Sequence, residues 1–77
     1  MEKKSVINLK RIMGLRAEHG ETQLDVAKVL NISLTTYQNR EWGLSDFKAS
    51  ELIALAEHWG VDVKELLLLH HRNIFLY

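Results

Sequence analysis

Apolar residues recur at three- and four-residue intervals along most of the chain, which is the spacing of short amphipathic α-helices. The first predicted helix carries its inward positions on one face, at Leu9, Ile12, Met13 and Arg16. We expect Ser5 to cap this helix and Gly20 to end it. Proline is absent from the sequence, which favours helices throughout.

Capping residues predict the next two helices. Thr22 is a favourable N-cap, and Asp25 places a negative charge in the first turn that follows. The inward stripe of this second helix is Val26, Ala27 and Leu30. A polar turn then ends in Ser33, which is expected to cap a third helix from Leu34 to Trp42.

The rest of the sequence predicts a loop over residues 44–47, a fourth helix at about Lys48 to Trp59 and a fifth that begins at Asp62. The apolar set of the fourth helix is Leu52, Ile53, Leu55, Ala56 and Trp59. In the fifth helix Asp62 and Glu65 have the spacing of a capping box, and the inward positions are Leu66, Leu67 and Leu69. The tail, residues 70–77, has no clear period, so it adds to the core, pairs with a second chain or has no fixed structure. We predict one all-α domain over residues 1–77.

Composition narrows the class of protein. The 77 residues allow one small core, so a partner or a dimer is expected to add stability. The absence of cysteine excludes disulfides and thiolate metal sites and fits a reducing, cytoplasmic compartment. The apolar run at residues 66–69 is far too short to span a membrane, and no apolar signal core follows the basic residues near the start.

The sequence offers no constellation typical of an enzyme. Its four histidines lack metal-ligand spacing; they are His19, His58, His70 and His71. Glu18, Glu21 and Asp25 are interpreted as solvated or capping residues rather than as an acid/base pair. No glycine-rich phosphate loop is present. We therefore expect no catalytic activity, no metal, no cofactor and no small-molecule ligand.

Charge is distributed unevenly although the formal net charge is zero, with ten basic and ten acidic residues. Residues 1–20 hold five basic and two acidic residues, whereas residues 22–43 hold two of each. Small DNA-binding domains are often basic, because neutralising phosphates provides much of their affinity. Here the positive charge is expected on the first helix and not on the third.

Residues 22–43 have the pattern of a helix-turn-helix, two short helices joined by a tight turn in which the small Ala27 lets them cross closely. The residues that carry this pattern are Arg16, Gly20, Thr22, Gln23, Val26, Ala27, Leu30, Ile32, Ser33, Tyr37, Glu41, Gly43, Leu55, Ala56, Trp59, Gly60, Val61, Glu65, Leu66 and Leu67. In this order and spacing the chain resembles the Cro/C1-type (XRE-like) helix-turn-helix family over about Leu9 to Leu67. The resemblance implies a five-helix, lambda-repressor-like domain of a small phage switch regulator. Its third helix would enter the major groove of operator DNA, usually as a homodimer.

The resemblance also implies which residues contact DNA. Base-reading positions fall on Leu34, Thr35 and Asn39, with Gln38 as a further reader. Backbone contacts are expected from Gln23, Lys28, Thr36 and Arg40. Side-chain chemistry agrees in part, because Asn39 can bind both edge atoms of adenine and Thr35 can contact a thymine methyl. The alternative interpretation of these polar residues is an ordinary solvated helix face.

Departures from the family pattern keep a second function open. Leu34 stands where the family has a polar reader, and the loop at 44–47 lacks the cations that grip phosphate. These changes favour an antirepressor that binds the DNA-reading face of a partner repressor through an apolar and acidic patch, formed by Glu21, Leu24, Asp25, Val29, Leu34, Leu44 and Phe47. For Phe47 and for Trp42 the competing interpretation is burial in the core. Antitoxins share the same fold, and the sequence neither favours nor excludes them.

Overall fold

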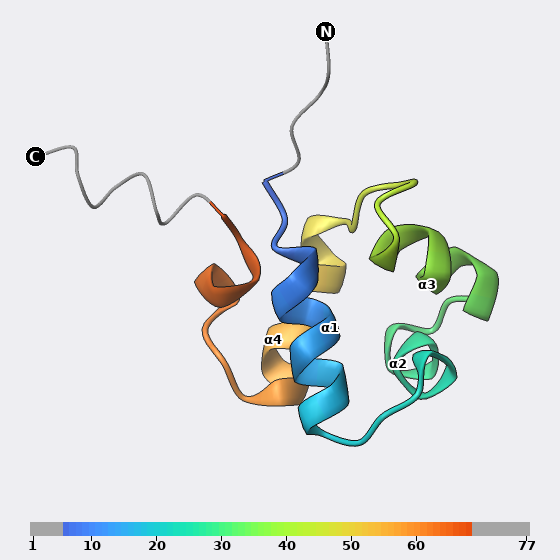
Figure 1. Ribbon diagram of the computed structural model, residues 1–77, viewed down its shortest axis with the longest axis horizontal. Coiled ribbons are helices and arrows are strands. Elements are labelled where there is room, and N and C mark those ends of the chain that lie inside the picture. The colour runs from blue at the N-terminus through green and yellow to red at the C-terminus, as the bar shows by residue number, and fades with distance from the viewer. Residues whose placement is uncertain (1–5, 69–77) are drawn as a thin grey trace, which may run out of the picture.

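The computed structural model describes residues 6–68, which form four α-helices and one 3₁₀-helix (Figure 1). The elements in order are α1 (Leu9–Glu18), α2 (Gln23–Leu30), α3 (Leu34–Glu41), α4 (Ala49–Trp59) and η1 (Val63–Leu66). The predicted all-α class is confirmed. The expected fifth α-helix is instead the single 3₁₀ turn η1. Leu69 and the tail at 70–77 lie outside the described residues.

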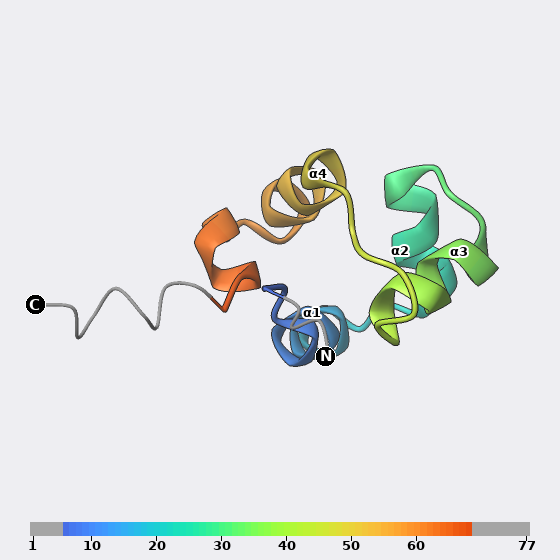
Figure 2. The ribbon, with the colours of Figure 1, turned by 90° about the horizontal axis from the view of Figure 1, so that it is seen from above.

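Different elements occupy the two opposite ends of the fold (Figures 1 and 2). The pair α2 and α3 forms one end, while η1 and the segments leading to both termini form the other. The helices α1 and α4 lie between them. The helix-turn-helix pair is therefore far from both ends of the described residues.

The start of α1 differs from the sequence prediction. Its N-cap is Asn8, whose side-chain oxygen accepts a hydrogen bond of 3.0 Å from the backbone N–H of Arg11. The residues before it are extended, because Ile7 forms an antiparallel bridge with Leu67. The backbone N–H of Asn8 also donates to the carbonyl of Leu66 at 2.8 Å. This pairing delays the helix, and the expected cap Ser5 lies outside the described residues.

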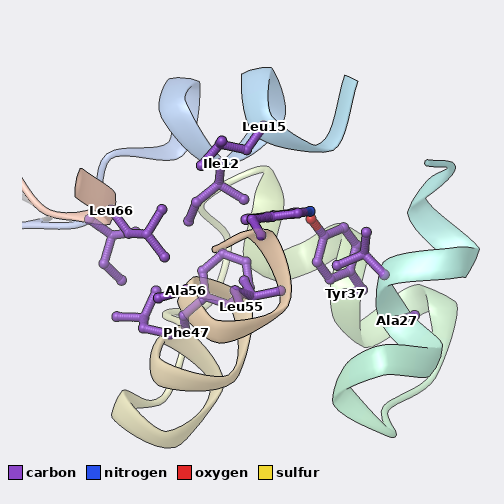
Figure 3. Packing of buried hydrophobic residues seen from close by; sticks show 12 residues of the cluster. Ile12, Leu15, Ala27, Tyr37, Phe47, Leu55, Ala56 and Leu66 are labelled. Carbon is purple, nitrogen blue, oxygen red and sulfur yellow. The ribbon is translucent and has the colours of Figure 1, made fainter. Parts of the chain in front are cut away.

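The core gathers side chains from all five elements and from the loop before α4 (Figure 3). Ile12 and Leu15 reach inward from α1, and Leu55 and Ala56 reach inward from α4 (Figure 3). Phe47 is only 5% exposed and lies edge-on to Tyr37, with ring centroids 5.9 Å apart. The loop therefore contributes to the core.

Two apolar residues lie outside the core, contrary to expectation. Ile53 is 53% exposed, because the inward stripe of α4 is centred on Leu52, Leu55 and Trp59, and Ile53 lies roughly 100° round the helix from Leu52. Trp42 is 59% exposed and is the C-cap of α3. The competing interpretation of Trp42 as a core residue is therefore wrong.

Candidate nucleic-acid interface

Capping hydrogen bonds fix the starts of both helices of the helix-turn-helix. The hydroxyl of Thr22 accepts from the backbone N–H of Asp25 at 3.0 Å, and the Asp25 carboxylate accepts from the backbone N–H of Thr22 at 2.9 Å. This reciprocal pair fixes the start of α2. Asn31 turns the chain with a left-handed φ of 58°, which asparagine tolerates better than most residues. Ser33 then caps α3 by accepting from the backbone N–H of Thr36 at 3.0 Å.

Ala27 lies fully buried where α2 packs on α3. A larger side chain at a fully buried position between packed helices is expected to cause overpacking. The expected close crossing of the two helices is confirmed, and the caps and Ala27 together hold α3 at a fixed angle to α2.

The outward face of α3 carries a ridge formed by Thr35, Asn39 and Trp42, at i, i+4 and i+7 spacing. Thr35 and Trp42 are exposed, and Asn39 is half-buried. Leu34 and Gln38 lie on one flank of this ridge, with Leu34 exposed and Gln38 half-buried. Thr35, Gln38 and Asn39 thus share the outer side of α3, and Trp42 extends it. The fourth expected base reader, Leu34, lies at the edge of this side, roughly 140° round the helix from Asn39.

The inward face of α3 is held by a buried carboxylate. The Glu41 side chain is only 1% exposed, and Arg16 of α1 pairs with it through Nε at 2.9 Å and Nη2 at 3.1 Å. The hydroxyl of Tyr37 donates to the same carboxylate at 2.7 Å. Burial and this hydrogen bond raise the pKa of Tyr37, so the phenol stays protonated. Arg16 therefore anchors α3 to α1, and the neutral hydroxyl of Tyr37, on α3 itself, adds a further donor to the carboxylate.

Two amide side chains continue from Glu41 toward the surface. The Nε2 of Gln23 donates to Glu41 Oε1 at 2.9 Å, and the Nε2 of Gln38 donates to Gln23 Oε1 at 3.0 Å. Gln23 is the first residue of α2 and Gln38 lies in the middle of α3. This series of hydrogen bonds joins Gln23, which is expected to contact the DNA backbone, to Gln38, which is expected to read a base.

Arg40 is held by partners within the protein. Its Nε and Nη2 donate to the two carboxylate oxygens of Glu51 at 2.8 and 3.1 Å, and its Nη1 donates to the hydroxyl of Ser45 at 3.2 Å. All three nitrogens of the guanidinium are engaged within the protein, so Arg40 fixes the loop after α3 against α4. A phosphate contact by Arg40 would have to compete with these partners.

Lys28 and Thr36 are also expected to contact the DNA backbone, and they differ in how far their side chains are engaged within the protein. Lys28 is exposed on α2, where a lysine can reach a phosphate without breaking another contact. Thr36 is half-buried and its hydroxyl oxygen accepts from Ser33 at 2.9 Å, which leaves its own O–H able to donate.

The expected protein-binding patch is only partly assembled. Phe47 is buried in the core, so it cannot line a surface. Glu21 accepts from Trp59 Nε1 at 2.8 Å and lies 2.6 Å from His58 Nε2, which ties it to α4. Leu24 and Val29 are both exposed, but five residues of helix place them roughly 140° apart.

The remaining exposed leucines of that patch lie near the reading face. Leu24 follows Gln23 in α2, and Leu34 lies one helical turn before Gln38 in α3. Leu44 is 73% exposed in the loop after α3. The carboxylate of Asp25 accepts a hydrogen bond from the backbone N–H of Thr22 in the cap of α2. The patch therefore reduces to Leu24, Leu34 and Leu44.

Acid is expected to destabilise the fold through three carboxylates. Burial alone would raise the pKa values of Glu21, Glu41 and Glu51, but their hydrogen bonds outweigh it and hold the pKa values below the ordinary 4.5. A lowered folded-state pKa adds stability above the unfolded pKa, and this stability is lost as the pH falls through the folded one.

We expect the thermal midpoint to stay nearly constant down to about pH 5 and then to fall steadily toward about pH 3. A Glu41→Gln variant should melt lower near neutral pH and show a shallower acid slope. Circular dichroism melts across this range measure both. A thermal midpoint at about pH 3 equal to that at neutral pH would contradict the stabilising role assigned to these three carboxylates.

The described residues contain no arrangement typical of a metal site or of a membrane-spanning helix. Within residues 6–68, no group of three or more acidic, histidine or cysteine side chains is arranged to hold a metal ion. Over the same residues, no helix has the length and apolar character needed to cross a membrane.

Comparison with known proteins gives one match. A family model described as helix-turn-helix matches residues 12–66, which is more than half of the chain. The matched range begins inside α1 and ends with η1, so it contains the capped pair, the buried Glu41 and the ridge on α3. No curated protein and no solved structure matches the chain significantly.

Proposed function

The chain belongs to the Cro/C1-type helix-turn-helix family of DNA-binding regulators, and from this premise we propose that it controls transcription by reading operator DNA through α3. The observation that carries the proposal is that two polar residues of the ridge, Thr35 and Asn39, lie on a helix whose opposite face is fixed by Glu41. A rigid helix with hydrogen-bonding side chains on its outer face fits the major groove, where each base pair has a distinct pattern.

Each contact in the proposal follows from side-chain chemistry. Asn39 pairs with adenine, and Thr35 and Leu34 make apolar contact with thymine methyl groups. Phosphates are met by Lys28, Thr36 and the free amide hydrogen of Gln23, and these contacts set register without reading sequence. Arg40 is not among them, because Glu51 and Ser45 hold its guanidinium.

The biological setting is part of the same proposal. The resemblance of the sequence to Cro-like proteins supports a repressor in a phage-type genetic switch. A two-fold homodimer on such an operator would place its α3 helices about 34 Å apart, one turn of DNA.

Selection from a random duplex library tests the proposal directly. The full chain should enrich one sequence motif, and titrations should give tighter binding to that motif than to a scrambled duplex. Equal and weak binding to every duplex at low salt would reject the proposal.

Salt dependence should be shallow for a DNA-binding domain. Few free cations lie near the reading face, so the slope of log K against log salt should be on the order of −1 to −3. Lys28→Ala should reduce its magnitude by about 0.9, since one phosphate contact is lost. Fluorescence anisotropy over a salt series measures both slopes, and Glu57→Ala on α4 is the control. A steep slope that Lys28→Ala leaves unchanged would contradict the assignment of Lys28.

One observation favours a second candidate function, an antirepressor that covers the reading face of a partner repressor. Leu24 on α2, Leu34 on α3 and Leu44 in the loop after α3 are all exposed. Apolar area contributes about 25 cal/mol per Å² when it is buried against protein, whereas phosphates gain little from it. The neutral charge of residues 22–43 also suits a protein partner better than DNA.

A titration with the repressor encoded at the same locus, on its operator, separates the two functions. An antirepressor should release the repressor from DNA, and Leu24→Lys and Leu34→Lys should each abolish this release. Val29→Lys is the matched control, because Val29 is also exposed but lies on the other flank of α2. If both leucine variants still release the repressor, the leucines do not form the contact.

A further inference from the structure

We propose that Gln38 selects adenine over guanine, and that Glu41, acting through Gln23, sets the donor and acceptor pattern that Gln38 presents to the base. The inference rests on the proposed function, since it requires α3 to enter the major groove. It goes beyond that function by naming the base that one residue reads and two positioning residues that determine the choice.

The argument starts from Glu41, whose pairing is complete. Four hydrogen bonds reach its carboxylate, two from Arg16, one from Tyr37 and one from Gln23. The hydrogen bonds hold the pKa of Glu41 below its ordinary value although burial opposes them. An ionised carboxylate accepts and never donates. Any amide that touches it must present its nitrogen.

This requirement fixes the orientation of Gln23. A glutamine amide can normally turn over and exchange its oxygen and nitrogen at little cost. Here the nitrogen must face Glu41, at 2.9 Å, so the oxygen faces Gln38. Turning Gln23 over would set its oxygen against the carboxylate and leave two acceptors in contact without a hydrogen.

Gln38 is oriented in turn. The only group it can offer to the Gln23 oxygen is its own nitrogen, which donates at 3.0 Å. One of its two N–H hydrogens is therefore used within the protein. One N–H and the carbonyl oxygen remain for DNA.

A single donor beside a single acceptor matches one purine. In the major groove adenine offers the N7 acceptor and the N6 amino donor, which pair with an amide N–H and an amide oxygen. Guanine offers two acceptors, N7 and O6, and needs two donors. A glutamine without the restraint could turn both hydrogens toward guanine, whereas Gln38 has given one of them to Gln23.

The position of Gln38 suits this role. It is half-buried on the flank of the ridge and lies directly before Asn39 in the sequence. The restraint comes from α2 and α1, so it is in place before DNA arrives. The amide then loses less conformational entropy on binding.

The test uses the full chain, the selected duplex and its single-site A-to-G variants. The wild type should prefer adenine over guanine at the base that Gln38 reads, by roughly 5- to 150-fold. Gln38→Met should remove this preference and leave those at other positions. Gln23→Met keeps the reader but removes the oxygen that restrains it, so the preference at that same base should fall toward one.

Gln23→Met is also expected to weaken binding to all sequences equally, through its lost phosphate contact. The diagnostic readout is therefore the adenine-to-guanine ratio at one base, which a general loss of stability or affinity does not alter. Circular dichroism checks folding, and Gln23→Leu serves in its place if the methionine variant does not fold.

The inference is overturned if Gln23→Met keeps the wild-type ratio, or if Gln38→Met leaves every adenine preference in place. A wild-type chain that enriches no motif rejects the proposed function itself. The two failures are therefore distinguishable.

Discussion

An Arg16→Met variant is expected to lose about 3 kcal/mol of unfolding free energy. Arg16 is the only cation among the partners of Glu41 in the described structure. Removing it leaves a carboxylate that is 1% exposed without a compensating charge. Breaking a buried ion pair costs about 3–5 kcal/mol, and the lower end applies here because Arg16 is itself partly exposed.

Urea denaturation of the two proteins measures this loss. The double variant with Glu41→Gln is the matched control, because it removes the stranded charge while keeping an oxygen that can accept from Tyr37. It should be more stable than Arg16→Met alone by at least about 1 kcal/mol. A double variant less stable than Arg16→Met would show that charge is not the source of the loss.

Asn39→Ala should cause the largest loss of specific DNA binding. Asn39 lies in the middle of the ridge, and a bidentate contact with adenine is worth about 1–3 kcal/mol. The affinity for the selected duplex should therefore fall by roughly 5- to 150-fold, while binding to a scrambled duplex changes little. Anisotropy titrations with both duplexes measure the two effects.

Two comparisons make this prediction specific to base reading. Glu57→Ala, on α4, should bind both duplexes like the wild type. Asn39→Ala should keep the wild-type melting temperature within a few degrees, because the side chain lies on the outer face. Equal losses on both duplexes would assign Asn39 to the phosphate backbone instead.

Local chemistry explains what could be predicted from the sequence. Thr22 and Ser33 cap α2 and α3 through hydrogen bonds three residues away, so the sequence alone contains both partners. Ala27 belongs to the same class, because a small residue in an inward stripe already indicates a close crossing. The helix-turn-helix and its outward side were therefore predicted before any long-range contact was known.

Long-range partners are what the sequence does not reveal. Arg40 follows the rule for a cation near DNA, but its partner Glu51 is eleven residues away in a different helix. Glu21 was expected in a surface patch, yet Trp59 binds it from 38 residues away. Helical spacing shows which way a side chain leaves its own helix and not what meets it there.

The Gln23–Gln38 pair shows the same limit at the site itself. Both residues were expected near DNA, one on the backbone and one on a base, but their hydrogen bond joins residues fifteen apart. Nothing local distinguishes a free glutamine from one whose nitrogen is committed. The signal that could have found it is the buried Glu41, because a carboxylate inside a small core needs donors from several elements.

The measurement that tests the central claim most directly is an NMR titration of the isotopically labelled chain with its selected duplex. If α3 reads DNA, the largest shift changes should fall on Thr35, Gln38 and Asn39 and on the first turn of α2, while α4 changes little. Changes concentrated on α4 or η1, or none at concentrations where the duplex binds, would contradict the account.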